Sequence, residues 1–352
     1  MNKKLLHLEF LRIIAIILVI FNHTGEYGFH LFKHKQGSSL YWIYMFFAIA
    51  CKVAVPLFWM ISGALLIDKE ETIKDVYSKR ILRMGFVLIV FSFIQYLYNN
   101  IINASDKGVV YFIKKLYSDE WATAYWYIYA YLGILVLLPI LRKMAKYMSN
   151  KEFVYLFVVT ITITGIIPVV EFLLYEKQDI LNGKFTGVFF STNIMFFLMG
   201  YYIEKRIKEE SLTYKKAAIW AFFGFVSIVI SCLMTQLQIN IIGKGTEGAT
   251  QQFYNVLIAI PAFAIFYVAR TFFSKIKIRS IIKKIIMLLG SVSFGVMLIE
   301  NILRKELKFI VEELNDKIPD FSACVIWVMV VWICGVLISL ILKQIPMLKK
   351  LL

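Results

Sequence analysis

The sequence predicts an all-α protein, a polytopic membrane helix bundle of about ten transmembrane helices with both termini in the cytoplasm. The chain of 352 residues is 60% apolar and only 18% charged, with a mean hydropathy of +0.72. Soluble domains average about 45–50% apolar and about 25% charged residues. Apolar runs of about 20 residues, the length that crosses a bilayer, recur along the chain. Basic residues collect in alternate connections between these runs. This pattern excludes a soluble enzyme, a disordered protein and a disulfide scaffold.

Ten apolar runs are candidate spans, and short polar connections join them, so residues 1–352 form a single predicted membrane domain. The runs are 10–29, 41–67, 80–102, 125–142, 152–174, 187–203, 216–239, 251–273, 285–305 and 322–345. The first run follows two lysines, as the apolar part of a signal peptide does. It lacks a cleavage site of small residues, so we expect it to be retained as the first helix.

The distribution of basic residues predicts the orientation. With the N-terminus inside, the cytoplasmic segments hold 26 of the 39 Lys and Arg residues and the outer segments hold 12. The positive-inside rule favours this orientation, and ten spans return the C-terminus to the cytoplasm. The net charge of +16 is therefore explained without a nucleic-acid partner. The four cysteines lie in apolar runs without metal-ligand spacing, so no metal is expected.

The first run holds charged side chains where the membrane makes them costly. Arg12 and His23 are eleven residues apart, which on a helix is about 20° from three full turns and about 16 Å along the axis. They therefore share a face. Glu9 pairs naturally with Arg12, and Glu26 with His23, each at i,i+3 spacing. Ionisable residues inside a span face a bundle interior or cavity by default. A snorkelling arginine and a histidine bonded to a neighbouring helix are the alternative.

Two later runs also carry charges. Lys52 lies well inside the second run, four residues before Pro56, which should kink the helix. A charge beside a broken helix at membrane depth indicates a lined cavity. Ser62 and Gly63 would permit a close approach of another helix. In the ninth run Glu300 follows an apolar stretch and lies in the predicted outer third of the membrane.

Arg80 and Arg83 form a basic pair at the cytoplasmic start of the third run. Their i,i+3 spacing puts both side chains on one face. Guanidinium groups match phosphate oxygens, and a helix N-terminus attracts anions. The pair is a candidate phosphate site, and ordinary contact with lipid headgroups is the alternative.

Five stretches in this order resemble the integral-membrane acyltransferases of acyltransferase family 3, which modify bacterial surface carbohydrates and related acceptors. The resemblance covers nearly the whole chain. The matching stretches are Arg12 and His23 with ten residues between them, residues 55–63, the pair Arg80 and Arg83, residues 126–130 with 138–141, and residues 291–300. The last stretch departs from the family pattern, because Met297 and Glu300 stand where tyrosine and histidine are common.

The resemblance implies an O-acyltransferase in the plasma membrane of a bacterium, spanning it several times among the membrane lipids. It implies acyl-CoA, most often acetyl-CoA, as the donor substrate. The implied acceptor is a hydroxyl of a cell-surface carbohydrate or its lipid-linked glycan precursor. Arg80 and Arg83, extended by Arg12, fit the role of binding the donor's phosphates. His23 fits the general base, because a neutral imidazole accepts protons near pH 7.

Other roles stay open at this point. Glu26 or Glu300 would orient His23 or hold its charge, and Lys52 would stabilise the oxyanion or pair with Glu300. A membrane carrier or flippase for a lipid-linked sugar or small solute is the competing class, because it would also have ten helices and intramembrane charges. It would not need an arginine pair in line with a buried histidine. The chain also shows no repeated half, which transporters often have.

Overall fold

The computed structural model describes residues 6–102, 107–176, 191–242, 257–349 and 351. Within these ranges the regular elements are helices and none is a strand, which confirms the all-α prediction. The α-helices are α1 (Leu6–Asn22), α2 (Ser39–Ala50), α3 (Ala54–Leu66), α4 (Ile73–Val76), α5 (Leu82–Ile102), α6 (Val109–Ser118), α7 (Trp126–Tyr147), α8 (Asn150–Ile161), α9 (Ile167–Tyr175), α11 (Thr192–Tyr201), α12 (Tyr214–Ile242), α15 (Ala259–Lys275), α16 (Ser280–Glu306), α17 (Lys308–Asn315), α18 (Asp320–Leu342) and α19 (Pro346–Lys349).

Seven helical segments in the described part of the chain are long and apolar enough to cross a membrane. They are Ser39–Leu66, Ile73–Ile102, Thr123–Tyr147, Asn150–Tyr175, Tyr214–Ile241, Ser280–Glu306 and Asp320–Leu342. They correspond to seven of the ten predicted runs. The first, sixth and eighth runs correspond to the shorter helices α1, α11 and α15. The beginnings of the sixth and eighth runs, 187–190 and 251–256, lie outside the described residues. The protein is a multi-pass membrane helix bundle.

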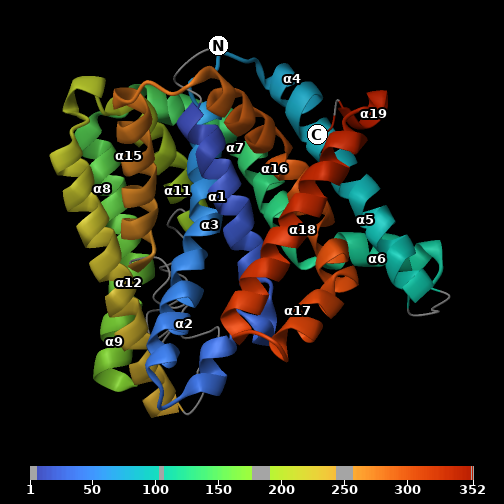
Figure 1. Cartoon of the computed structure of the whole chain (residues 1–352). Helices are drawn as coiled ribbons and strands as arrows, with labels where there is room; N and C mark the ends of the chain where they lie inside the picture. The colour runs from blue at the N-terminus through green and yellow to red at the C-terminus, as the bar shows by residue number, and fades with distance from the viewer. Residues whose placement is uncertain (1–5, 103–106, 177–190, 243–256, 350, 352) are drawn as a thin grey trace.

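Helix α1 lies in the interior of the bundle and positions the site. It packs against α3, α16 and α18, while α3 also contacts α11, and α12 pairs with α15. In Figure 1, α8, α9 and α12 lie on one side of α1 and α3, and α5 and α6 lie on the other. The start of α1 and the end of α18 lie at the same end of the bundle (Figure 1), as an even number of crossings requires.

The end of α1 differs from the prediction, because the helix stops at Asn22 rather than continuing to residue 29. Thr24 turns the chain: its Oγ1 donates to the Phe21 carbonyl oxygen at 2.7 Å and accepts the Phe29 N–H at 2.9 Å. Gly25 follows with a φ of 57°, a left-handed conformation that glycine adopts without a steric penalty. The chain then continues in short 3-10 turns.

The break predicted in the second run is present. A 3-10 turn, Cys51–Val53, separates α2 from α3, and it contains Lys52. The close approach predicted at Gly63 is also confirmed, because a Cβ there would lie 1.7 Å from a carbonyl oxygen of α11. Gly200 of α11 makes the reciprocal contact with α3, where a Cβ would lie 1.9 Å from a carbonyl oxygen. The backbones of α3 and α11 are therefore in direct contact at these two positions, and any residue larger than glycine would prevent that contact.

The orientation stays a prediction that reporter fusions can check. Fusions after Lys143 and Lys283 are expected to report the cytoplasm, and fusions near Lys107 and Asp316 the opposite side. The reason is the excess of basic residues in the first pair of connections. A reversed signal at two or more of the four positions would overturn the orientation.

Candidate active site

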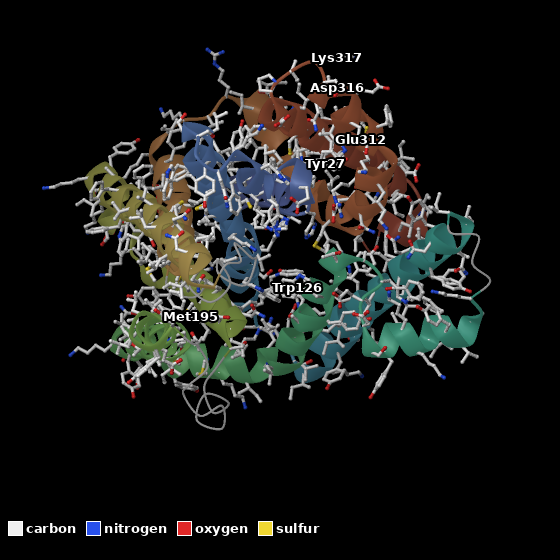
Figure 2. The ribbon with its side chains drawn as sticks, turned by 90° about the horizontal axis from the view of Figure 1, so that it is seen from below. Tyr27, Trp126, Met195, Glu312, Asp316 and Lys317 are labelled. Atoms are coloured by element: carbon white, nitrogen blue, oxygen red, sulfur yellow. The ribbon has the colours of Figure 1, made fainter. Side chains whose placement is uncertain are left out.

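Two cavities lie inside the bundle, and the predicted site residues divide between them. The histidine cavity, about 400 Å³, is lined by Val19, Asn22, His23, Phe29, Cys51, Lys52, Ala54, Val55, Phe58, Thr123, Ala124, Trp126, Tyr127, Asn193 and Met297. The arginine cavity, about 350 Å³, is lined by Arg12, Phe58, Ser62, Leu65, Leu66, Lys69, Lys79, Arg80, Arg83, Met84, Tyr127, Tyr131, Leu135, Gly290, Ser291, Ser293, Phe294 and Met297. Figure 2 looks at the end of the bundle opposite to the start of α1, and Trp126 lies near its middle.

His23 is paired with a buried carboxylate. Its Nδ1 lies 2.9 Å from Oε1 of Glu300, whose side chain has no solvent exposure. An ionised carboxylate only accepts hydrogen bonds, so we assign the proton of the neutral imidazole to Nδ1. That tautomer leaves the lone pair on Nε2, which has no hydrogen-bond partner among the described residues. A histidine held through one nitrogen by a carboxylate, with the other nitrogen available, is the arrangement of a general base.

Further polar side chains hold Glu300 in place. Nε of Arg304 lies 3.4 Å from Oε2 of Glu300, and Nη2 of Arg304 donates to Oδ1 of Asn301 at 3.2 Å. Asn301 in turn donates to Oε1 of the buried Gln95 at 3.1 Å. Sequence reasoning missed Arg304 as a site residue. Its i,i+4 spacing from Glu300 was the available signal.

Glu26 is not the partner of His23, which corrects one predicted pairing. Its two carboxylate oxygens lie 3.1 Å from Nδ1 of His30 and 2.8 Å from Nε2 of His34. The predicted i,i+3 pair required a helix that continued past His23. Because α1 ends at Asn22, Glu26 leaves that face and lies half-exposed outside the histidine cavity.

Besides His23, four side chains that line the histidine cavity carry N–H groups. Lys52 is one, and its Nζ lies 4.6 Å from the centroid of the Phe29 ring, within the range of a cation–π contact. The others are Asn22, Trp126 and Asn193. These are the donors that can stabilise a developing oxyanion in this cavity.

The arginine cavity is strongly positive. Five cations line it and no Asp or Glu does: Arg12, Lys69, Lys79, Arg80 and Arg83. A cleft lined by one sign of charge concentrates ligands of the opposite sign. The predicted pair of Arg12 with Glu9 is present, with Nη1 2.6 Å from Oε1. Arg12 lies on α1 and His23 directly follows the last residue of that helix, and the two side chains line the two different cavities.

Arg80 and Arg83, the basic pair predicted from the sequence, both form hydrogen bonds within the protein. Nε and Nη2 of Arg80 donate to both oxygens of Glu71 at 2.7 and 2.6 Å, and Arg142 donates to the same carboxylate at 2.8 Å. The hydrogen bond from Arg80, joined by that from Arg142, lowers the pKa of Glu71 to about 2. The cluster therefore stays ionised until the pH falls towards 2. Arg83 instead donates to the carbonyl oxygen of Leu351 at 2.8 and 3.2 Å, so no described carboxylate neutralises it.

Phe58, Tyr127 and Met297 line both cavities, and we call this boundary the neck. The rings of Phe58 and Tyr127 are 6.0 Å apart, and Tyr127 also packs on Trp59 with ring centroids 4.4 Å apart. Met297 closes the set with an unbranched thioether, a side chain that changes rotamer readily. The neck is thus the place where a molecule bound in one cavity would extend into the other.

Met297→Trp is expected to block the neck. The indole would fill the space between the cavities, so with acetyl-CoA, the donor that the sequence resemblance implies, we expect the release of CoA to fall at least tenfold. The matched control is Leu288→Trp, an equal change at a half-exposed position of the same helix that lines neither cavity. Chromatographic measurement of free CoA checks the result. Equal rates in the two variants would show that nothing passes the neck.

His7 lies before the first predicted run, which begins at residue 10, but the structure includes it in α1. It lies in the first turn of α1, is buried, and its Nε2 lies 2.9 Å from Oε2 of Glu204. Nε of Arg270 lies 3.4 Å from the same oxygen. This cluster lines neither the histidine cavity nor the arginine cavity, so His23 remains the histidine of the candidate site.

Comparison with known proteins identifies the family. A family model described as an acyltransferase domain matches residues 5–343, nearly the whole chain, and so includes both cavities and the neck. No curated protein and no solved structure gives a significant match. The family match favours an enzyme over the carrier that the sequence left as an alternative. The chain belongs to acyltransferase family 3 and is a membrane acyltransferase.

Proposed function

We propose that this protein moves an acyl group, foremost acetyl, from cytosolic acyl-CoA to a hydroxyl of a cell-surface glycan or its lipid-linked precursor. The observation that carries the proposal is the arrangement of the two cavities about one neck. A cluster of cations lines the first cavity, and a histidine paired with a buried carboxylate lines the second. Acyl transfer from acyl-CoA to a hydroxyl uses a site for the phosphates of CoA and a base for the hydroxyl proton.

The donor would bind with its phosphates in the arginine cavity and its pantetheine arm in the neck. Arg83 is the foremost phosphate ligand, because its described partner is a neutral carbonyl group rather than a carboxylate. Arg80 contributes charge but remains shared with Glu71. Arg12, on the helix that ends beside His23, lies along the same path.

The reaction then proceeds in the histidine cavity. Nε2 of His23 takes the proton of the acceptor hydroxyl, whose oxygen attacks the thioester carbonyl carbon. The resulting oxyanion accepts hydrogen bonds from the donors that line the cavity, among them Lys52. Collapse of the tetrahedral intermediate breaks the C–S bond, and the CoA thiolate takes the proton from the imidazolium. The carboxylate of Glu300, 2.9 Å from Nδ1, stabilises the imidazolium while it exists.

The proposed acceptor reaches the histidine cavity from the side opposite to the donor. Trp126, at the middle of that end, is 38% exposed and lines the cavity, so its ring can pack against a sugar (Figure 2). We place the protein in the plasma membrane of a bacterial cell, where cytosolic acyl-CoA lies on one side and envelope glycan on the other.

Purified protein with radiolabelled acetyl-CoA tests the proposal. An acyltransferase is expected to bind acetyl-CoA and to release CoA slowly with water as the acceptor. Addition of an envelope oligosaccharide should accelerate CoA release and move the label onto the sugar. Absence of both binding and CoA release would contradict the proposed donor, and binding with no label on any hydroxyl acceptor would contradict the proposed transfer.

Arg83→Ala is expected to raise the Kd for acetyl-CoA at least tenfold. A charge-assisted phosphate contact contributes about 1.5–3 kcal/mol, and the contact that the variant loses in the free protein is only to a carbonyl group. Lys208→Ala is the control, because this substitution also removes one positive charge, and the exposed Lys208 does not line the arginine cavity. Calorimetric titration at two salt concentrations measures the difference. Equal Kd values in both variants would assign Arg83 to lipid headgroups instead.

A further inference from the structure

A lateral groove of about 990 Å³ runs between α1, α12, α15 and the start of α16, separate from the two cavities of the site. On α15 its lining extends from Pro261 to Phe273. Twelve residues of helix rise about 18 Å, which exceeds the roughly 15 Å that one leaflet contributes to a hydrocarbon core of about 30 Å. The groove is therefore long enough to hold the acyl chain of a lipid.

The lining of the groove is apolar except at one end, where two basic side chains stand. Lys277 and Arg279 are its only lining residues with polar side chains, and both lie in the connection from α15 to α16. Both side chains are exposed, and neither side chain forms a hydrogen bond or an ion pair with the described part of the chain. No carboxylate lines the groove. Its rim therefore offers two cations to an anionic group, while its length offers hydrocarbon contacts.

The rim lies at the end where α1 begins (Figure 1), which the basic-residue count assigns to the cytoplasm. The cytoplasmic leaflet carries the anionic lipids, and basic pockets between transmembrane helices on that side bind their headgroups. The positive charge of the rim, the length of the groove and its side of the membrane all favour a lipid with an anionic headgroup.

We propose that the lateral groove is a binding site for an anionic phospholipid of the cytoplasmic leaflet. One acyl chain lies along α15, and the phosphate contacts Lys277 and Arg279. Phe10, Leu11 and Ile14 form the wall contributed by α1, so the lipid packs against the helix that carries Arg12. This site is independent of the proposed acyl transfer.

Native mass spectrometry of the full chain tests the proposal, after incubation in detergent with equal amounts of dioleoyl phosphatidylglycerol and dioleoyl phosphatidylcholine. The wild type is expected to retain phosphatidylglycerol preferentially. In the double variant Lys277→Gln, Arg279→Gln, the ratio of bound phosphatidylglycerol to bound phosphatidylcholine should fall about thirtyfold. This factor corresponds to about 2 kcal/mol for two basic residues near an anionic headgroup. The control variant Lys283→Gln, Lys284→Gln removes the same charge from the start of α16 but not from the groove, and should keep the preference.

A second variant tests the hydrocarbon part. Val268→Trp would fill the groove from a half-buried lining position with a side chain suited to the membrane. It should lower retention of both lipids while the protein stays monodisperse. The proposal is overturned if the two lipids are retained equally by the wild type, if both double variants lose the preference alike, or if Val268→Trp retains phosphatidylglycerol as the wild type does.

Discussion

His23→Gln is expected to lower acyl transfer by about 10²–10⁴-fold, the range over which a general base contributes. Glutamine can still form a hydrogen bond with Glu300 and keeps the cavity polar, but it cannot accept a proton near neutral pH. The Kd for acetyl-CoA should stay within about twofold, because the phosphate site lies in the other cavity. Release of CoA and transfer of label measure the rate, and calorimetry measures the binding.

His34→Gln is the matched control, because this exposed histidine also pairs with a carboxylate but lies outside the histidine cavity. It should keep the wild-type rate. A His23→Gln variant with close to wild-type turnover would mean that the histidine only satisfies a buried hydrogen bond. The proton of the acceptor would then have to pass to Glu300.

Glu300→Gln is expected to reduce the rate by a similar factor through a different cause. The neutral amide would no longer select the Nδ1–H tautomer or stabilise the imidazolium, so a correctly placed His23 would be a poorer base. The substitution also leaves Arg304, whose side chain is only 18% exposed, without its carboxylate partner. Removing one partner of a buried charge pair costs about 3–5 kcal/mol of stability. A lower rate in the single variant could therefore reflect either a loss of folded protein or a loss of catalysis.

The double variant Glu300→Gln, Arg304→Gln separates the two effects. It removes one negative and one positive charge together, so no buried charge is left without a partner. Its melting temperature should therefore lie close to that of the wild type and above that of Glu300→Gln. Its rate of acyl transfer should stay near that of Glu300→Gln. If the rate recovered together with the melting temperature, Glu300 would be a structural residue and not a positioning residue for His23.

Features that depend on spacing along one helix were predictable. The pair of Arg12 with Glu9 could be read from the sequence, because both residues lie within α1 at i,i+3 spacing. The break at Lys52 and the close approach at Gly63 were also readable, because proline and glycine act on the local backbone. The helical membrane fold followed from hydropathy alone.

Features that depend on tertiary contacts were not predictable. Glu300 is 277 residues from His23, and no rule of spacing selects it over the nearby Glu26, which the turn at Gly25 removes from the site. Glu71, which lies in the connection before α4, binds Arg80 and also Arg142 of α7, which is 71 residues further along the chain. In both cases the partner is chosen by how the helices pack, and the sequence of one segment does not contain that information.

A determined structure with a non-hydrolysable thioether analogue of acetyl-CoA tests the central claim most directly. We expect the phosphates of the analogue to lie in the arginine cavity beside Arg83, its pantetheine arm between Phe58, Tyr127 and Met297, and its acyl carbonyl carbon in the histidine cavity. The carbonyl carbon should lie where an acceptor oxygen about 3–3.5 Å from it can also reach Nε2 of His23. An analogue bound with its acyl end outside the neck, or with its phosphates away from the arginine cavity, would contradict the account.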